Sequence, residues 1–140
     1  METSPLPSAP TTPRAGSVRL LNDWGIELSS VTVRHRRGND PRRQDEKTWN
    51  SVAPGSTAEG ALAITYDARG VTHPDSYDYW WVKLIARDEE VQACKDDFFC
   101  SLTPDDDGTV TLTLDGGPRK LHVEFSHSTG CSVALHPIRT

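Results

Sequence analysis

The chain of 140 residues is about one domain long, and its 35% of hydrophobic residues can form a core built from short strands. A net charge of −5 argues against a nucleic-acid partner, because proteins that bind phosphate backbones more often carry a basic domain. No apolar run approaches the roughly 20 residues needed to span a bilayer, and the first residues lack the apolar centre of a secretory signal, so we expect a cytoplasmic protein without a transmembrane segment.

The chain begins with a polar tail that is followed by short strands. Residues 1–16 contain prolines among serine and threonine, which leaves nothing to bury, so we expect a disordered tail and one domain over residues 17–140. Residues 17–22 and 26–36 are each predicted to form a strand, and a hairpin is the simplest link between them. In the second strand, His35 shares a face with valines.

A very polar segment over residues 37–47 has Gly38 and Pro41 as breakers, so we expect an exposed loop. Trp49 follows this loop. We expect its indole to cap the core at one end of the domain, with ligand stacking as the other interpretation. Residues 59–66 are then predicted to form a strand with an apolar face.

An aromatic segment over residues 75–86 holds two of the three tyrosines and two of the four tryptophans. Alternating aromatic and β-branched residues predict a strand. Tyr77, Tyr79 and Trp81 would lie on one face, and Asp78 and Trp80 on the other. A tryptophan on each face indicates a strand that is covered, or nearly covered, on both sides.

The C-terminal third continues the same pattern of strands and turns. A charged turn over residues 87–90 precedes a strand or strand pair over residues 91–102, and alternating strands follow at residues 109–114, 121–125 and 131–135. About eight short strands in all predict an all-β fold, a two-sheet antiparallel β-sandwich.

Several short sequence motifs occur in order at residues 18–22 and 29–33, 49–55, 78–82, 99–102 and 106–108, with Cys131 near the end. Taken together, they resemble the PUD family, small β-sandwich proteins that are up-regulated in long-lived nematodes. The resemblance covers about residues 17–138 and implies an architecture similar to that of the aegerolysins, which bind membrane sphingolipids. It implies no reaction and no agreed site residues, and it allows a homodimer.

Neither the cysteines nor the histidines predict a metal or a cofactor. The three cysteines lack the paired spacing of a zinc site, and the five histidines are dispersed. Cys100 and Cys131 fall in strand patterns and are interpreted as core thiols or a bridged pair, whereas Cys94 is expected to be the more exposed thiol. The acidic run at residues 105–107 lacks the alternation of a calcium loop and is expected to be a solvated turn.

Two functional hypotheses of different class remain. The first is a non-enzymatic binding module that recognises a lipid headgroup, a sugar or a protein partner through an aromatic-rich face. Its candidate ligand-binding residues are Tyr77, Tyr79, Trp81, His73, Asp75, Trp49 and Trp24.

The second hypothesis is a small cofactor-free enzyme of the cyclase or isomerase type. It would act on a hydrophobic small molecule in a cavity between the sheets, with a carboxylate or an imidazole as the acid or base. The candidate catalytic residues are Asp78, Asp97 and His35.

Overall fold

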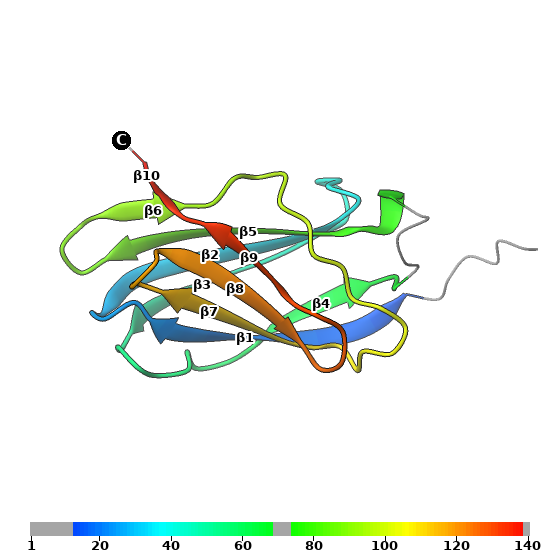
Figure 1. Cartoon of the computed structure of the whole chain (residues 1–140), viewed down its shortest axis with the longest axis horizontal. Helices are drawn as coiled ribbons and strands as arrows, with labels where there is room; N and C mark the ends of the chain where they lie inside the picture. Colours follow the sequence, from blue (N-terminus) through cyan, green and yellow to red (C-terminus); the bar gives the residue numbers. More distant parts are fainter. Residues whose placement is uncertain (1–12, 69–73, 139–140) are drawn as a thin grey trace, which may run out of the picture.

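The computed structural model describes residues 13–68 and 74–138, and these form two five-stranded sheets packed face to face (Figure 1). The first, sheet A, contains in spatial order β4 (Leu62–Tyr66), β1 (Arg14–Asp23), β7 (Thr109–Asp115), β8 (Lys120–Phe125) and β9 (Cys131–Ala134). The second, sheet B, contains β10 (His136–Pro137), β6 (Val91–Ala93), β5 (Asp78–Ala86), β2 (Leu28–Arg37) and β3 (Gln44–Val52). The predicted all-β sandwich is confirmed, with one parallel pair, β1 and β7, among antiparallel neighbours.

The core lies between the sheets and follows the period of two that strands impose. Alternate side chains of the central strands point inward and have at most 1% of their surface exposed: Val110, Leu112 and Leu114 in β7, and Trp80, Val82 and Leu84 in β5. The strand β5 lies between β6 and β2, as expected for a central strand. The buried residues of β5 contribute to the hydrophobic stabilisation of the fold, and the residues on its other face can contact solvent or a ligand.

The link between the first two strands differs from the expected hairpin, because β1 belongs to sheet A and β2 to sheet B. The turn between them crosses from one sheet to the other. It is held by the fully buried Asn22, whose amide donates to the carbonyl oxygens of Ile26 and Val52 at 3.0 and 2.9 Å. The first strand also begins at Arg14, before the expected boundary at residue 17.

Two further segments differ from the sequence-based expectation. Residues 44–47, expected in a loop, belong to β3, because they pair with residues 33–36 of β2. The expected strand or strand pair over residues 91–102 shrinks to β6, and the later part is an irregular segment that touches β5 through an isolated bridge between Phe99 and Tyr79. The polar residues 95–97 interrupt pairing here.

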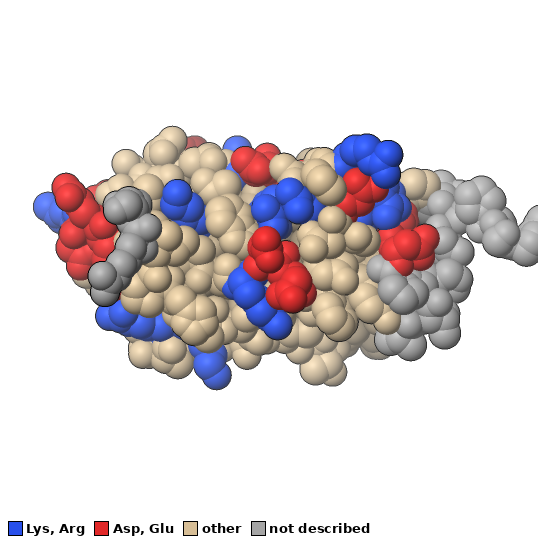
Figure 2. All heavy atoms as spheres, turned by 90° about the horizontal axis from the view of Figure 1, so that it is seen from above, with Lys and Arg blue, Asp and Glu red and all other residues tan. Residues whose placement is uncertain are grey.

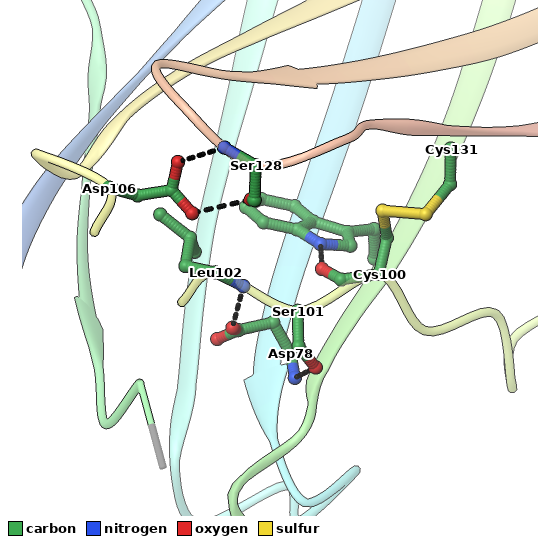
Figure 3. The surroundings of a disulfide bond; sticks show 8 residues. Asp78, Cys100, Ser101, Leu102, Asp106, Ser128 and Cys131 are labelled. Carbon is green, nitrogen blue, oxygen red and sulfur yellow. Dashed lines mark hydrogen bonds between the residues drawn. A yellow bond between two sulfur atoms is a disulfide. The ribbon is translucent and has the colours of Figure 1, made fainter. Parts of the chain in front are cut away.

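A disulfide joins this irregular segment to sheet A. Cys100 and Cys131 are bonded, with their Cα atoms 6.0 Å apart, which selects the bridged pair of the two interpretations (Figure 3). The third cysteine, Cys94, is buried rather than exposed, because its side chain packs in the hydrophobic core just after β6, where the Val82 N–H donates to its sulfur. Burial raises the pKa of the Cys94 thiol.

The buried Asp106 fixes the next loop to the turn between β8 and β9 (Figure 3). Its carboxylate accepts hydrogen bonds from the backbone N–H groups of Thr103, His127 and Ser128, each at 2.8 Å, and from the Ser128 hydroxyl. Burial by itself raises the pKa of Asp106, but these hydrogen bonds outweigh it and lower the pKa well below its usual range. The acidic run therefore includes a structural anchor as well as a solvated turn.

We expect the disulfide to contribute about 3–4 kcal/mol to stability, the entropy of closing a loop of this length in the unfolded chain, since the cysteines are 31 residues apart. Urea unfolding with and without dithiothreitol measures this. The reductant should lower the midpoint of the unmodified protein and leave that of the Cys100→Ala/Cys131→Ala variant unchanged. An unmodified protein with the same midpoint in both conditions would contradict the disulfide.

Candidate functional site

The outer face of sheet B gathers side chains from β5 and β2 into one surface. Because alternate residues of a strand share a face, Tyr79 and Trp81 of β5 point away from the core that Trp80 and Val82 fill. The pairing of β2 with β5 places Arg36 opposite Tyr79 and Arg34 opposite Trp81. Two arginines on one strand thus lie beside two aromatic residues on the next.

Two more rings extend the aromatic side of this surface. Phe99 stacks on Tyr77 with ring centroids 5.0 Å apart and contacts Tyr79 at 5.7 Å. With 52% of its surface exposed, Phe99 is the most exposed large hydrophobic residue among those described. The four residues Tyr77, Tyr79, Trp81 and Phe99 are called the aromatic face below.

Backbone hydrogen bonds to β5 hold Phe99 in position. The Trp80 N–H donates to the carbonyl oxygen of Phe98, and the Cys100 N–H donates to that of Asp78, both at 2.9 Å. Phe98 and Cys100 are buried on either side of Phe99, so the segment alternates like a strand and directs Phe99 outward. Phe99 was not among the residues predicted from the sequence. The alternation of Phe98, Phe99 and Cys100 could have indicated that Phe99 points to the face opposite its two neighbours.

The two arginines are held by neutral partners. The Arg34 guanidinium lies over the Trp81 ring, 5.0 Å from its centroid. Arg36 donates from Nε to Gln44 Oε1 at 2.7 Å, and from a terminal nitrogen to Asn39 Oδ1 at 3.4 Å. Partial burial and then the charge of Arg36 lower the pKa of Arg34.

A buried charged network lies directly beneath this surface. His35 of β2 is fully buried, with Nε2 2.7 Å from Asp78 Oδ1 and Nδ1 3.1 Å from Asp45 Oδ2. Asp78, also fully buried, accepts a further hydrogen bond from the Leu102 N–H at 2.9 Å (Figure 3). Asp45 accepts one from the Thr65 N–H in sheet A at 3.1 Å. The network therefore joins three strands of sheet B, namely β2, β3 and β5, to β4 of sheet A through Thr65 and to the irregular segment through Leu102.

The two carboxylates around His35 favour its imidazolium form. Carboxylates can only accept hydrogen bonds, so both ring nitrogens must carry protons for both bonds to form. Burial by itself lowers the pKa of His35, but the hydrogen bonds to Asp45 and Asp78 and their charges outweigh burial and raise it. The same pairing lowers the pKa of Asp45 against the opposing effect of its partial burial. Asp45 was not foreseen, because its segment was expected to be a loop.

The candidate catalytic residues do not share an open site. His35 and Asp78 meet, but both have 0% of their surface exposed. The third, Asp97, is solvent-exposed and pairs with Lys95 at 3.8 Å. A groove of about 470 Å³ runs along β3 beside Trp49, and none of the three residues lines it.

The candidate ligand-binding residues separate into two groups. Tyr77, Tyr79 and Trp81 come together on the aromatic face, and the exposed Asp75 precedes them in η1 (Pro74–Ser76). Trp49 is buried and donates its indole N–H to the carbonyl oxygen of Gly60 at 2.9 Å, as expected for a residue that caps the core. Trp24 follows β1, at the opposite end of the sandwich from η1, and His73 lies outside the described residues (Figure 1).

No protein-family model matches the chain, and no curated protein matches it. Within residues 13–68 and 74–138, no group of three or more His, Cys, Asp or Glu residues could hold a metal ion. No helix in the same residues is long and apolar enough to cross a membrane.

We expect the network around His35 to make stability depend on pH. Because the pKa of His35 is raised in the folded state, its contribution is fully present below the ordinary value of 6.5 and is lost as the pH rises through the raised value. The lowered pKa of Asp45 acts in the opposite direction, so its contribution is present above the ordinary value of 3.8 and lost in acid.

Replacing one member of such a buried pair leaves the other charge unpaired, so His35→Gln should cost about 3–5 kcal/mol of the free energy of unfolding. The measurement is urea unfolding between pH 5 and pH 9. Stability of the unmodified protein should fall toward pH 9, and the variant should lose this slope. The control is His127→Gln, an exposed histidine that should keep the slope. Equal slopes in all three proteins would show that His35 is not the titrating group.

Proposed function

We propose that the protein is a non-enzymatic binding module that recognises its ligand, a lipid headgroup, a sugar or a protein partner, through the aromatic face. The observation that carries the proposal is the exposure of Phe99, 52%, in a cluster with Tyr77 and Tyr79. Large aromatic residues bury much surface on binding and lose few rotamers, so they dominate the energy of many interfaces.

The scaffold beneath the aromatic face supports this proposal. Tyr79 and Trp81 stand on a central strand whose opposite face is buried, and the buried Asp78 binds the segment that carries Phe99. A surface held in this way loses little entropy on binding, because it is already ordered. Rigid aromatic side chains on a sheet are therefore suited to recognition without a conformational change.

The charge distribution favours a specific ligand over an extended polyanion. Figure 2 shows acidic and basic side chains interleaved in small groups on one face of the molecule, without a broad field of one sign. Together with the net charge of −5, this supports the prediction that nucleic acid is not the partner.

The enzyme hypothesis has less support. His35 and Asp78 are fully buried, so a substrate would have to displace core residues to reach them. The resemblance to the PUD family, a homodimer and a cytoplasmic location stay predictions. The disulfide weighs against the last of these, because such bonds are more typical of oxidising compartments.

We expect the Phe99→Ser variant to lose binding on arrays of glycans, lipids and proteins that the unmodified chain recognises. Truncating a central aromatic residue of an interface costs about 2 kcal/mol or more, which is roughly a 30-fold loss of affinity. Tyr79→Ser should have a similar effect.

The matched control is Ile26→Ser, which removes an exposed large hydrophobic residue, 38% exposed, from the turn before β2. It should leave binding unchanged. Retention of every array signal by Phe99→Ser and Tyr79→Ser would place the binding surface elsewhere and overturn the proposal.

A further inference from the structure

We propose that the aromatic face binds an acidic sugar, with Arg34 and Arg36 holding its anionic group while Phe99 and Tyr79 pack against its ring. The inference rests on the proposed function and specifies its ligand as a sugar residue that carries a carboxylate or a sulfate. Arg34, Arg36, Tyr79 and Phe99 are called the acidic-sugar site below.

The first argument is that, within the residues that the structure describes, these two neighbouring arginines form no ion pair, although Glu46 lies opposite Arg34 across the strands. Four other arginines, Arg37, Arg42, Arg43 and Arg119, pair with carboxylates at 3.0 to 3.8 Å. In the described part of the chain, neither Arg34 nor Arg36 comes within ion-pair distance of a carboxylate. Two adjacent cations that repel each other are stabilised by an anion placed between them.

The second argument is that both guanidinium groups are already oriented. Arg34 Cζ lies over the Trp81 ring, 5.0 Å from its centroid, and a cation–π contact of this kind uses none of the five N–H donors of a guanidinium as a hydrogen bond. Arg36 uses Nε for Gln44 and one terminal nitrogen for Asn39, so further N–H donors remain. The planar fork of donors in arginine matches the two oxygens of a carboxylate or the oxygens of a sulfate.

The third argument is the spacing of charge and ring. Arg34 and Arg36 are two residues apart on one strand, about 6.6–6.8 Å, and the cross-strand pairing of Arg36 with Tyr79 brings an aromatic residue alongside. A sugar ring has an apolar face of C–H groups that packs on aromatic rings, and its charged substituent projects from the ring edge. A sugar that packs on Tyr79 would therefore have its charged substituent beside Arg36, and Phe99, 5.7 Å from Tyr79, extends the ring surface on which it packs.

Local charges favour a ligand with isolated anionic groups over a nucleic acid. Glu46 lies opposite Arg34 in the pairing of β2 with β3, and the charges of Glu46 and Asp96 partly offset the lowering of the Arg34 pKa. Both carboxylates repel any approaching anion, so an extended line of phosphates meets more repulsion here than one carboxylate or sulfate held by both arginines. The degree of exposure also disfavours insertion into a membrane, because Phe99 is the strongly exposed ring and Tyr79 and Trp81 are half-buried.

The test is calorimetric titration of the full chain with defined probes. A galacturonic acid oligomer supplies carboxylates and a heparin-derived oligomer supplies sulfates. A malto-oligosaccharide of equal length is the neutral sugar, phosphatidylserine vesicles present an anionic lipid, and an oligothymidylate is the nucleic acid. We expect at least one acidic oligomer to bind at least about tenfold more tightly than the neutral one, since a charge-assisted hydrogen bond contributes about 1.5–3 kcal/mol.

The variant Arg34→Gln/Arg36→Gln should reduce acidic-sugar binding at least about tenfold. Its control, Arg14→Gln/Arg19→Gln, removes the same charge from exposed positions on β1 and should bind as the unmodified chain does. Arg36→Gln alone provides a second variant, because the side-chain hydrogen bonds of Arg36 among the described residues go to the exposed Gln44 and the loop residue Asn39. Phe99→Ser should weaken the same binding.

The outcomes separate this inference from the proposed function. If the neutral oligosaccharide bound as tightly as the acidic oligomers and Phe99→Ser abolished this binding, the proposed preference for an acidic sugar would be wrong, but the aromatic face would remain the binding surface. Binding of vesicles or oligothymidylate in place of acidic sugars would overturn the sugar and keep a binding role. Acidic-sugar binding that survives both Arg34→Gln/Arg36→Gln and Phe99→Ser would overturn both proposals. Failure of both acidic oligomers to bind at about 1 mM would overturn the inference, and the arrays would then decide the proposed function.

Discussion

The buried carboxylate of Asp78 is the constraint on which the candidate site depends. One oxygen pairs with His35 and the other accepts the Leu102 N–H, while its backbone carbonyl accepts the Cys100 N–H. A buried charge is costly unless it is paired and hydrogen-bonded, so the bonds to Asp78 favour the position in which the segment around Cys100 lies against β5. That position directs Phe99 outward to meet Tyr77 and Tyr79. The hydrogen bonds that satisfy the buried Asp78 in the core thus also position the proposed binding surface.

The same strands separate the two roles by alternation. Along β2, His35 points inward to the carboxylates, and Arg34 and Arg36 on either side point outward with neutral partners. The buried cation is fully paired, which makes it part of the scaffold. The outer cations are oriented but not neutralised, which makes them available to a ligand. The disulfide and Asp106 add covalent and hydrogen-bonded ties that hold the irregular segment between the sheets.

Local patterns predicted what depends on a single strand. The alternation around residues 75–86 correctly separated the outward Tyr79 and Trp81 from the inward Asp78 and Trp80, because the period of a strand is a property of its own residues. Local patterns do not determine which strands pair with each other. For this reason they did not predict that β1 and β2 belong to different sheets, or that His35 contacts Asp45. Phe99 was missed for the same reason, since its exposure follows from bonds to β5. Trp24 and Trp49, grouped with the aromatic strand by composition, lie elsewhere in the fold.

The indole N–H signals of the four tryptophans test the central claim most directly, because each reports on a different place. Trp81 lies on the aromatic face, Trp80 and Trp49 donate to backbone carbonyls in the core, and Trp24 follows β1 at the far end. Titrating ¹⁵N-labelled protein with the acidic oligomer that binds best should shift the Trp81 signal most and leave that of Trp24 unchanged. A largest shift at Trp24 or Trp49, with Trp81 unaffected, would contradict a ligand-binding surface on the outer face of sheet B.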